Sequence, residues 1–246
     1  MQYLLFLLML LKMQDLLTLF FLIACTYFSF YTKKLTLPGA ITGLLSAIII
    51  YRATGYAGLS MLAAFFITGT MATLCGRQAK LVLQKSGDGT QRKASQVLAN
   101  SGAATLISLM ALLIPLNHSV LLLIAASFSS ATADTLSSEL GMVYGKRFYN
   151  CISLKKEKRG MDGAISIEGT LIGTAGAILI ALIYSIFNVF NGDFLIIVFA
   201  GITGNYADSL FGVLLERKKL LNNDWVNFLS TVLAMLIAVL LSNGFF

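Results

Sequence analysis

Charged side chains are scarce in this sequence. They make up 12% of its 246 residues, whereas a soluble globular domain carries about 25%. Cysteine and histidine are also rare, since the three cysteines, Cys25, Cys75 and Cys151, lie far apart and His118 is the one histidine. This spacing excludes a Cys/His zinc cluster and a dithiol redox motif. We expect the cysteines to serve as small apolar filler.

Long apolar runs are what the sequence has in abundance. Hydrophobic residues make up 57% of the chain, and runs of roughly 20 such residues are long enough to cross a bilayer as helices. The runs lack the alternation of barrel strands. The sequence therefore predicts an all-α fold, a polytopic transmembrane helical bundle in a single integral membrane domain, 1–246. We expect eight spans, at about residues 16–31, 35–51, 57–75, 96–114, 119–133 and beyond, 165–187, 194–215 and 225–242.

Residues 1–15 are an N-terminal extension whose structure the sequence leaves open. The apolar run 4–11 is too short to cross a membrane alone, so it either lies at the interface or lengthens a tilted first helix. Residues 22–25 resemble a lipoprotein cleavage box, but no basic stretch precedes them. Whether residues 1–25 are retained therefore stays an open question.

Most of the basic residues lie in loops on one side of the predicted membrane spans. If the eight spans alternate in direction, 16 of the 18 Lys and Arg residues fall in loops on one side, and only Lys12 and Arg52 fall on the other. By the positive-inside rule the basic side is cytoplasmic, which places both termini outside. We therefore expect an integral protein of a prokaryotic plasma membrane. The net charge of +7 then reports topology and no nucleic-acid partner.

Two carboxylates interrupt the apolar runs in similar settings. Asp134 lies in the stretch ADTL and Asp208 in ADSL, at matching depths of two spans that run from outside to inside. The similarity suggests a parallel internal repeat. An acid within the bilayer is a functional-site candidate because it costs several kcal/mol there. The alternative is an ion pair inside the bundle, but Arg52, at an outer end, is the one cation within the spans.

Other polar residues lie near the basic ends of the spans, where each has an ordinary structural interpretation beside a functional one. Glu139 is either a second metal ligand or a surface acid. Glu168 opens the sixth span, where an acid suits the helix dipole, and Asp162 lies in a glycine-rich turn composition. The segment before the last span offers N-caps together with a polar face that continues into the membrane. The cap candidates are Asn222, Asn223 and Asp224, and the polar face begins with Asn223 and Asn227.

The loop between the third and fourth spans mixes cations with glycines. Basic side chains and exposed backbone amides suit phosphate oxygens, although the spacing is no Walker A motif and contact with anionic lipid headgroups explains it equally well. The nucleotide- or phosphate-binding candidates are Lys80, Arg92, Lys93, Gln96 and Asn100, with Lys146 and Arg147 from a later basic loop. The candidate metal ligands in the sequence offer only oxygen atoms, which favours Mg²⁺ over softer metals.

Five motifs resemble, in order, those of an integral membrane family that includes plant phytyl-phosphate kinase: QVLANSG, SSATADTLSSELG, GMDGAISIEGT, GNYADSLFG and LNNDWVNFLST. The resemblance runs from about residue 33 to the C-terminus. It places the family's acidic motif on Asp134 and Glu139 and its second aspartate on Asp208. Its other positions fall on Gln96, Asn100, Gly160, Asp162, Gly163, Ser166, Glu168, Gly169, Asn223, Asp224 and Asn227. Among these, the resemblance adds further nucleotide- or phosphate-binding candidates: Asp162, Ser166, Glu168, Asn223 and Asn227. Ser101 departs from the pattern, because we expect glycine directly after Asn100.

The resemblance implies phosphoryl transfer from a nucleoside triphosphate, CTP or ATP, to an isoprenoid or phytyl monophosphate in the membrane. In this hypothesis Asp134 and Asp208, with Glu139 or Asp224, bind one or two Mg²⁺ ions, because phosphoryl transfer needs mainly positioning and charge neutralisation. Two alternatives stay open. A transporter or flippase for an anionic lipid or solute would also use a repeat around ionisable groups. A CDP-alcohol type nucleotidyltransferase would use much the same acids.

Overall fold

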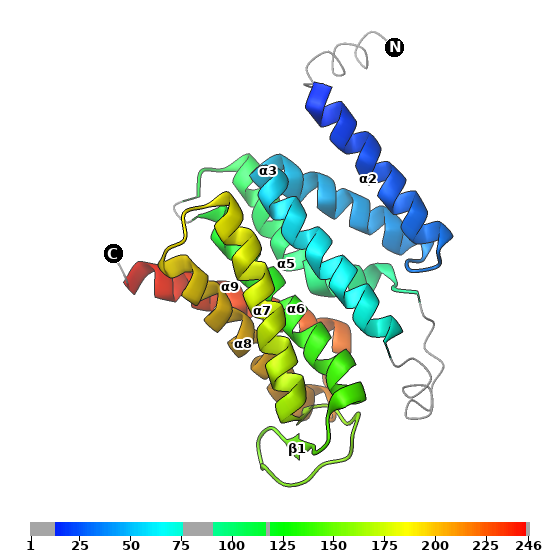
Figure 1. The fold of residues 1–246 in the computed structure, drawn as a ribbon, viewed down its shortest axis with the longest axis vertical. Coiled ribbons are helices and arrows are strands. Elements are labelled where there is room, and N and C mark those ends of the chain that lie inside the picture. Colours follow the sequence, from blue (N-terminus) through cyan, green and yellow to red (C-terminus); the bar gives the residue numbers. More distant parts are fainter. Residues whose placement is uncertain (1–12, 76–90, 117–118, 245–246) are drawn as a thin grey trace.

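The structure, a computed structural model, is an all-α bundle (Figure 1). It describes residues 13–75, 91–116 and 119–244. The helices are α2 (Met13–Tyr31), α3 (Leu37–Leu74), α5 (Ala94–Leu113), α6 (Val120–Tyr144), α7 (Ile167–Phe187), α8 (Gly192–Phe211), the π-helical turn η1 (Gly212–Glu216) and α9 (Asn223–Gly244). A short antiparallel hairpin, β1 (Tyr149–Asn150) and β2 (Ala164–Ile165), lies between α6 and α7. The predicted fold class is confirmed.

Side-chain caps set several helix starts close to the predicted span limits. Hydroxyls of Thr36, Ser119 and Ser166 accept backbone N–H groups in the first turns of α3, α6 and α7. The Asn191 side chain does the same for α8. Each cap satisfies a backbone donor that has no partner within its helix, and such a cap stabilises a helix by about 0.5–2 kcal/mol.

The number of helices differs from the number of predicted spans. Among the described residues, seven helices are long and apolar enough to cross a membrane, where we expected eight spans. The difference lies in α3, whose 38 residues would measure about 57 Å in a straight helix and exceed the hydrocarbon core of about 30 Å. Gly55 interrupts α3 with φ 64° and ψ −147°. The chain turns sharply there, so that α3 contains both predicted spans 35–51 and 57–75 (Figure 1).

Helix α6 forms the centre of the bundle. It packs against α3, α5, α7, α8 and α9, and its residues from Leu122 to Ala133 are buried. The apolar core gathers around it, with Phe65 of α3 stacked on Phe128. Helix α2 packs against α3 at the edge of the molecule (Figure 1). The polar residues of α6 are therefore held between its neighbours.

The connections that carry most of the basic residues gather on one side of the bundle. Leu35 and Arg92 form a parallel bridge, which joins the connection after α2 to the start of α5. In Figure 1 the α2–α3 connection lies at the right and the α6–α7 connection at the bottom, whereas the bend of α3 lies at the top and the α7–α8 connection toward the upper left. This arrangement is compatible with the prediction that the basic loops lie on one side of the membrane. Residues 1–12 and Lys80 lie outside the described residues.

Candidate functional site

Asp134 of α6 and Asp208 of α8 lie side by side. Their carboxyl groups are within hydrogen-bonding reach of each other, and the Ser230 side chain of α9 lies beside Asp208. Small residues permit this closeness, because a Cβ added to Gly204 would collide with the Ser130 side chain one turn before Asp134. Close backbone approach through small residues is the usual way in which helices pack in lipid. The two aspartates that stood out in the sequence thus form one site.

Several buried polar atoms at this site have no hydrogen-bond partner among the described residues. They are Asp208 Oδ2 and, one and two turns before Asp134 on α6, the hydroxyl oxygens of Ser130 and Ser127. A buried polar atom without a partner costs about 1–3 kcal/mol. Such groups in a folded protein usually face a water molecule or an ion. The aspartate pair therefore has a carboxylate oxygen, Asp208 Oδ2, that is available to a bound ion or water molecule.

Further acids surround the aspartate pair. Glu216, at the end of η1, acts electrostatically on Asp208 and also lies in range of Asp134, Asp162 and Asp224. Clustered carboxylates repel one another unless a proton or a cation neutralises part of their charge. No group of three or more His, Cys, Asp and Glu side chains is arranged to hold a metal ion within the described part of the chain. A Mg²⁺ site here would fit two carboxylates, with water and substrate phosphates as the remaining ligands.

Glu216 is the site residue that sequence reasoning missed. It stands in LLERKK, directly before three cations and just after the seventh predicted span. Eight residues beyond Asp208, it would point about 80° away from it in a regular α-helix. The π-turn changes this, because Arg217 N donates to Gly212 O at 3.0 Å and one extra residue enters the turn. Such turns are frequent at functional sites, but no periodicity in the sequence marks this one.

Arg92 enters the bundle beside Glu139. Its guanidinium lies 5.7 Å from the centre of the Phe65 ring and close to Gly69, where an added Cβ would stand 2.9 Å from a guanidinium nitrogen. Arg92 and Glu139 interact electrostatically, and Glu139 also accepts a hydrogen bond of 3.1 Å from the Thr73 hydroxyl. Glu139 is half-buried and in electrostatic range of Asp134. It is therefore a member of the polar interior and not a free surface acid.

The α6–α7 connection lies beside the acid cluster and is held there by hydrogen bonds from Arg217. This side chain donates to the Asp162 carbonyl at 2.7 Å and to Glu157 at 2.9 Å. Gly163, at φ +69°, lies so close to α8 that an added Cβ would meet the Ser209 carbonyl at 2.5 Å. Asp162 is thus near Glu216, because the connection is fixed against α8 and η1.

Several predicted phosphate-binding residues have local structural roles. Gln96 accepts the Lys93 N–H at 2.9 Å, and Asn100 donates to the Gln96 carbonyl. Ser166 caps α7, as already described, and Glu168 accepts the Lys146 N–H at 3.4 Å.

The remaining candidates lie at the surface or near the start of α9. Lys93, Lys146, Arg147 and Asn223 are exposed, and Asp224 and Asn227 are half-buried. Asn222 accepts the Trp225 N–H at 3.1 Å, so it is the one of the three cap candidates that caps α9. The Asn227 carbonyl accepts the Ser230 hydroxyl beside Asp208.

Comparison with known proteins identifies the family. A profile described as "Integral membrane protein DUF92" matches residues 20–235. The chain belongs to this family. The DUF92 match extends from α2 into α9 and includes every acid of the cluster described above.

Relatives of this DUF92 protein occur in archaea, plants and cyanobacteria. The uncharacterized membrane protein MJ0933 of Methanocaldococcus jannaschii is 37% identical over 207 residues, 82% of this chain and 84% of that protein. Protein VTE6, chloroplastic, of Arabidopsis thaliana is 29% identical over 84% of this chain and 65% of its own length. The uncharacterized membrane protein sll0875 of Synechocystis is 31% identical over 78% and 76% of the two chains. No solved structure matches this chain.

Proposed function

We propose that this protein transfers a phosphoryl group from a nucleoside triphosphate, CTP or ATP, to an isoprenoid or phytyl monophosphate in the membrane. The observation that carries the proposal is the adjacent pair Asp134 and Asp208, with Asp208 Oδ2 buried and without a hydrogen-bond partner among the described residues. The resemblance to the family of plant phytyl-phosphate kinase supports the choice of acceptor.

Magnesium is the metal that this donor set fits. Asp134 and Asp208 would hold it with carboxylate oxygens, and Glu216 or Glu139 would add negative charge nearby. When bound, the ion would neutralise donor and acceptor phosphates that otherwise repel each other. Softer metals would call for His or Cys ligands, which the acid cluster does not contain.

The side chains of the protein position the reactants. The Arg92 guanidinium, directed inward beside Glu139, offers paired N–H donors to phosphate oxygens. Lys93, Lys146 and Arg147, exposed at the predicted cytoplasmic face, add positive charge that attracts the nucleotide. No covalent nucleophile is required, because phosphoryl transfer depends mainly on positioning and electrostatic stabilisation.

The test is a turnover assay on purified, detergent-solubilised protein. The reaction contains Mg²⁺, geranylgeranyl or phytyl phosphate, and labelled CTP or ATP, and both lipid and nucleotide products are resolved. Formation of a lipid diphosphate with the matching nucleoside diphosphate supports the proposal. Release of inorganic diphosphate with a nucleotide-linked lipid would identify a nucleotidyltransferase. Saturable lipid binding without any product would identify a carrier.

A further inference from the structure

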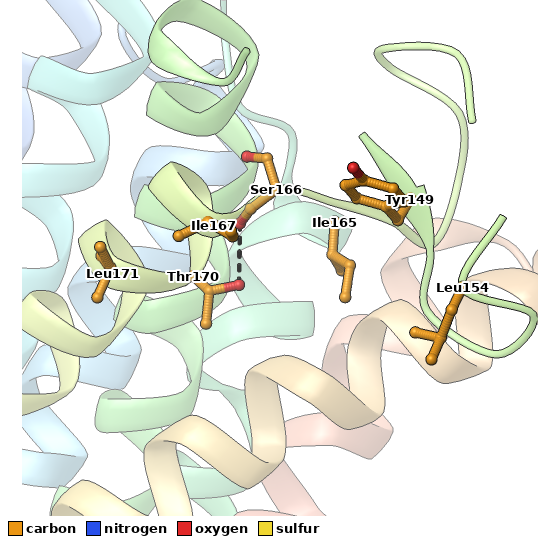
Figure 2. A pocket seen from close by; sticks show the side chains of 7 residues that line it. All are labelled: Tyr149, Leu154, Ile165, Ser166, Ile167, Thr170 and Leu171. Carbon is orange, nitrogen blue, oxygen red and sulfur yellow. Dashed lines mark hydrogen bonds between the residues drawn. The ribbon is translucent and has the colours of Figure 1, made fainter. Parts of the chain in front are cut away.

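An apolar groove lies between the β1–β2 hairpin and the first turns of α7. It has a volume of about 420 Å³, within the range of roughly 300–1,000 Å³ of small-molecule sites. Figure 2 shows the side chains that line it, which come from the hairpin segment and from α7. The apolar ones are Tyr149, Leu154, Ile165, Ile167 and Leu171. The lining suits a hydrocarbon chain.

The groove is separate from the aspartate pair. On α7, Gly169 and Gly173 face α6, where added Cβ atoms would meet Ser137 and Ala133 backbone atoms at 3.0 and 2.8 Å. Leu171, two residues from each, is 65% exposed and lies on the opposite face. The groove therefore opens away from the interior of the bundle.

The strand register places a cation at the rim of the groove. Tyr149 pairs with Ile165 on one side and forms an antiparallel bridge with Lys156 on the other. Residues directly opposite each other in antiparallel strands project from the same face. Because Tyr149 and Ile165 line the groove, Lys156 stands on the same face beside Tyr149. Leu154, which has a positive φ of 55° just before this bridge, also lines the groove.

The surroundings of the groove are positively charged and lie at a membrane interface. The segment from Lys146 to Arg159 has six exposed basic residues. Its one acid, Glu157, is bound by Arg217. The groove lies at the first turn of α7, which is itself long and apolar enough to span a membrane. It is thus at the depth where headgroups meet acyl chains, and anionic headgroups attract basic segments there.

We propose that this groove binds an anionic glycerophospholipid of the surrounding membrane. One acyl chain lies along Leu154, Ile165 and Leu171, and the phosphate pairs with Lys156. The lipid is a structural ligand and not the phosphoryl acceptor, because the groove opens on the face of α7 opposite the interior of the bundle. It joins the hairpin connection, which lies over the acids, to the bilayer.

The experiment is native mass spectrometry of the delipidated full chain in detergent. Phosphatidylglycerol and phosphatidylcholine with identical acyl chains are added in parallel. The charge variant Lys156→Gln is matched by Lys155→Gln, a neighbouring exposed lysine that is not part of the bridge to Tyr149. The filling variant Thr170→Trp is matched by Thr174→Trp, one turn further along α7, and both threonines donate to the carbonyl four residues before them.

We expect phosphatidylglycerol to bind better than phosphatidylcholine to the wild-type chain. Lys156→Gln should bind phosphatidylglycerol about fivefold more weakly, because it loses one interfacial cation. Thr170→Trp should not bind phosphatidylglycerol, because the indole fills the groove. Both control variants should bind it as the wild type does. Equal binding of the two lipids, or equal effects of Lys155→Gln and Lys156→Gln, would overturn the proposal. So would retention of binding in Thr170→Trp, or displacement of phosphatidylglycerol by geranylgeranyl phosphate.

Discussion

At the scale of single residues, Glu216 owes its place beside the aspartates to one wide turn of the backbone. We predict that Glu216→Gln raises the Mg²⁺ concentration needed for half-maximal turnover about tenfold, because it removes one of the negative charges that attract the cation. The measurement is a Mg²⁺ titration of the turnover rate. Asp193→Asn is the control, since Asp193 binds Tyr184 at the other end of α8. An unchanged Mg²⁺ requirement would remove Glu216 from the site.

Glu157 gives the chain a pH-dependent contact outside the membrane. The hydrogen bond from Arg217 lowers the pKa of Glu157. Its contribution to stability is therefore present above the unfolded-state pKa of about 4.3 and is lost as the pH falls through the lower folded value. We predict that wild-type protein melts at a higher temperature than Glu157→Gln at neutral pH, and that this small difference disappears below that folded value. Thermal unfolding at both pH values measures it, and a difference independent of pH contradicts the assignment.

The sequence identified residues whose chemistry contrasts with their surroundings. Asp134 and Asp208 are conspicuous because a carboxylate is expensive in an apolar span. Glu216 and Arg92 were harder to place, because acids and cations at span ends are ordinary. The direction of their side chains depends on a π-turn in one case and on Gly69 and the Phe65 ring in the other.

At the scale of helices, α6 and α8 meet through residues without bulk. A Cβ on Gly201 would collide with Ser129, whose hydroxyl donates to the Ile197 carbonyl at 3.0 Å. We predict that Gly201→Ala destabilises the protein by about 1–3 kcal/mol, the usual cost of overpacking a well-packed core. Gly192→Ala is the control, because an added Cβ there meets nothing within 4 Å. Thermal unfolding in detergent compares the two, and equal stability would refute the close contact.

Helix limits were largely predictable, whereas helix continuity was not. Apolar runs and capping residues such as Ser119 and Ser166 mark the ends in the sequence. The two spans 35–51 and 57–75 were also recognisable as apolar runs, but the sequence does not show that helical structure resumes directly on both sides of Gly55. Glycine permits the positive φ there, and its neighbours continue the helix without an intervening loop.

At the scale of the whole molecule, the loop charges predict orientation in the membrane. We predict that Lys155→Cys, in the hairpin connection, reacts with a membrane-impermeant maleimide only in inside-out vesicles. Val189→Cys, 81% exposed in the α7–α8 connection, should react only in intact spheroplasts. The unaltered chain gives the background labelling of the native cysteines. Labelling of both positions from the same side would contradict the topology.

The paired aspartates are the centre of the proposed site, and they are tested most directly by the rate of lipid diphosphate formation in Asp134→Asn and Asp208→Asn. Each change keeps the size of the side chain and removes its charge. We predict that each lowers kcat at least a hundredfold, about the effect of removing one group that stabilises a transition-state charge. Asp193→Asn, in the same helix as Asp208, should keep the wild-type rate. Full activity in Asp208→Asn, with the protein folded, would contradict the proposed site.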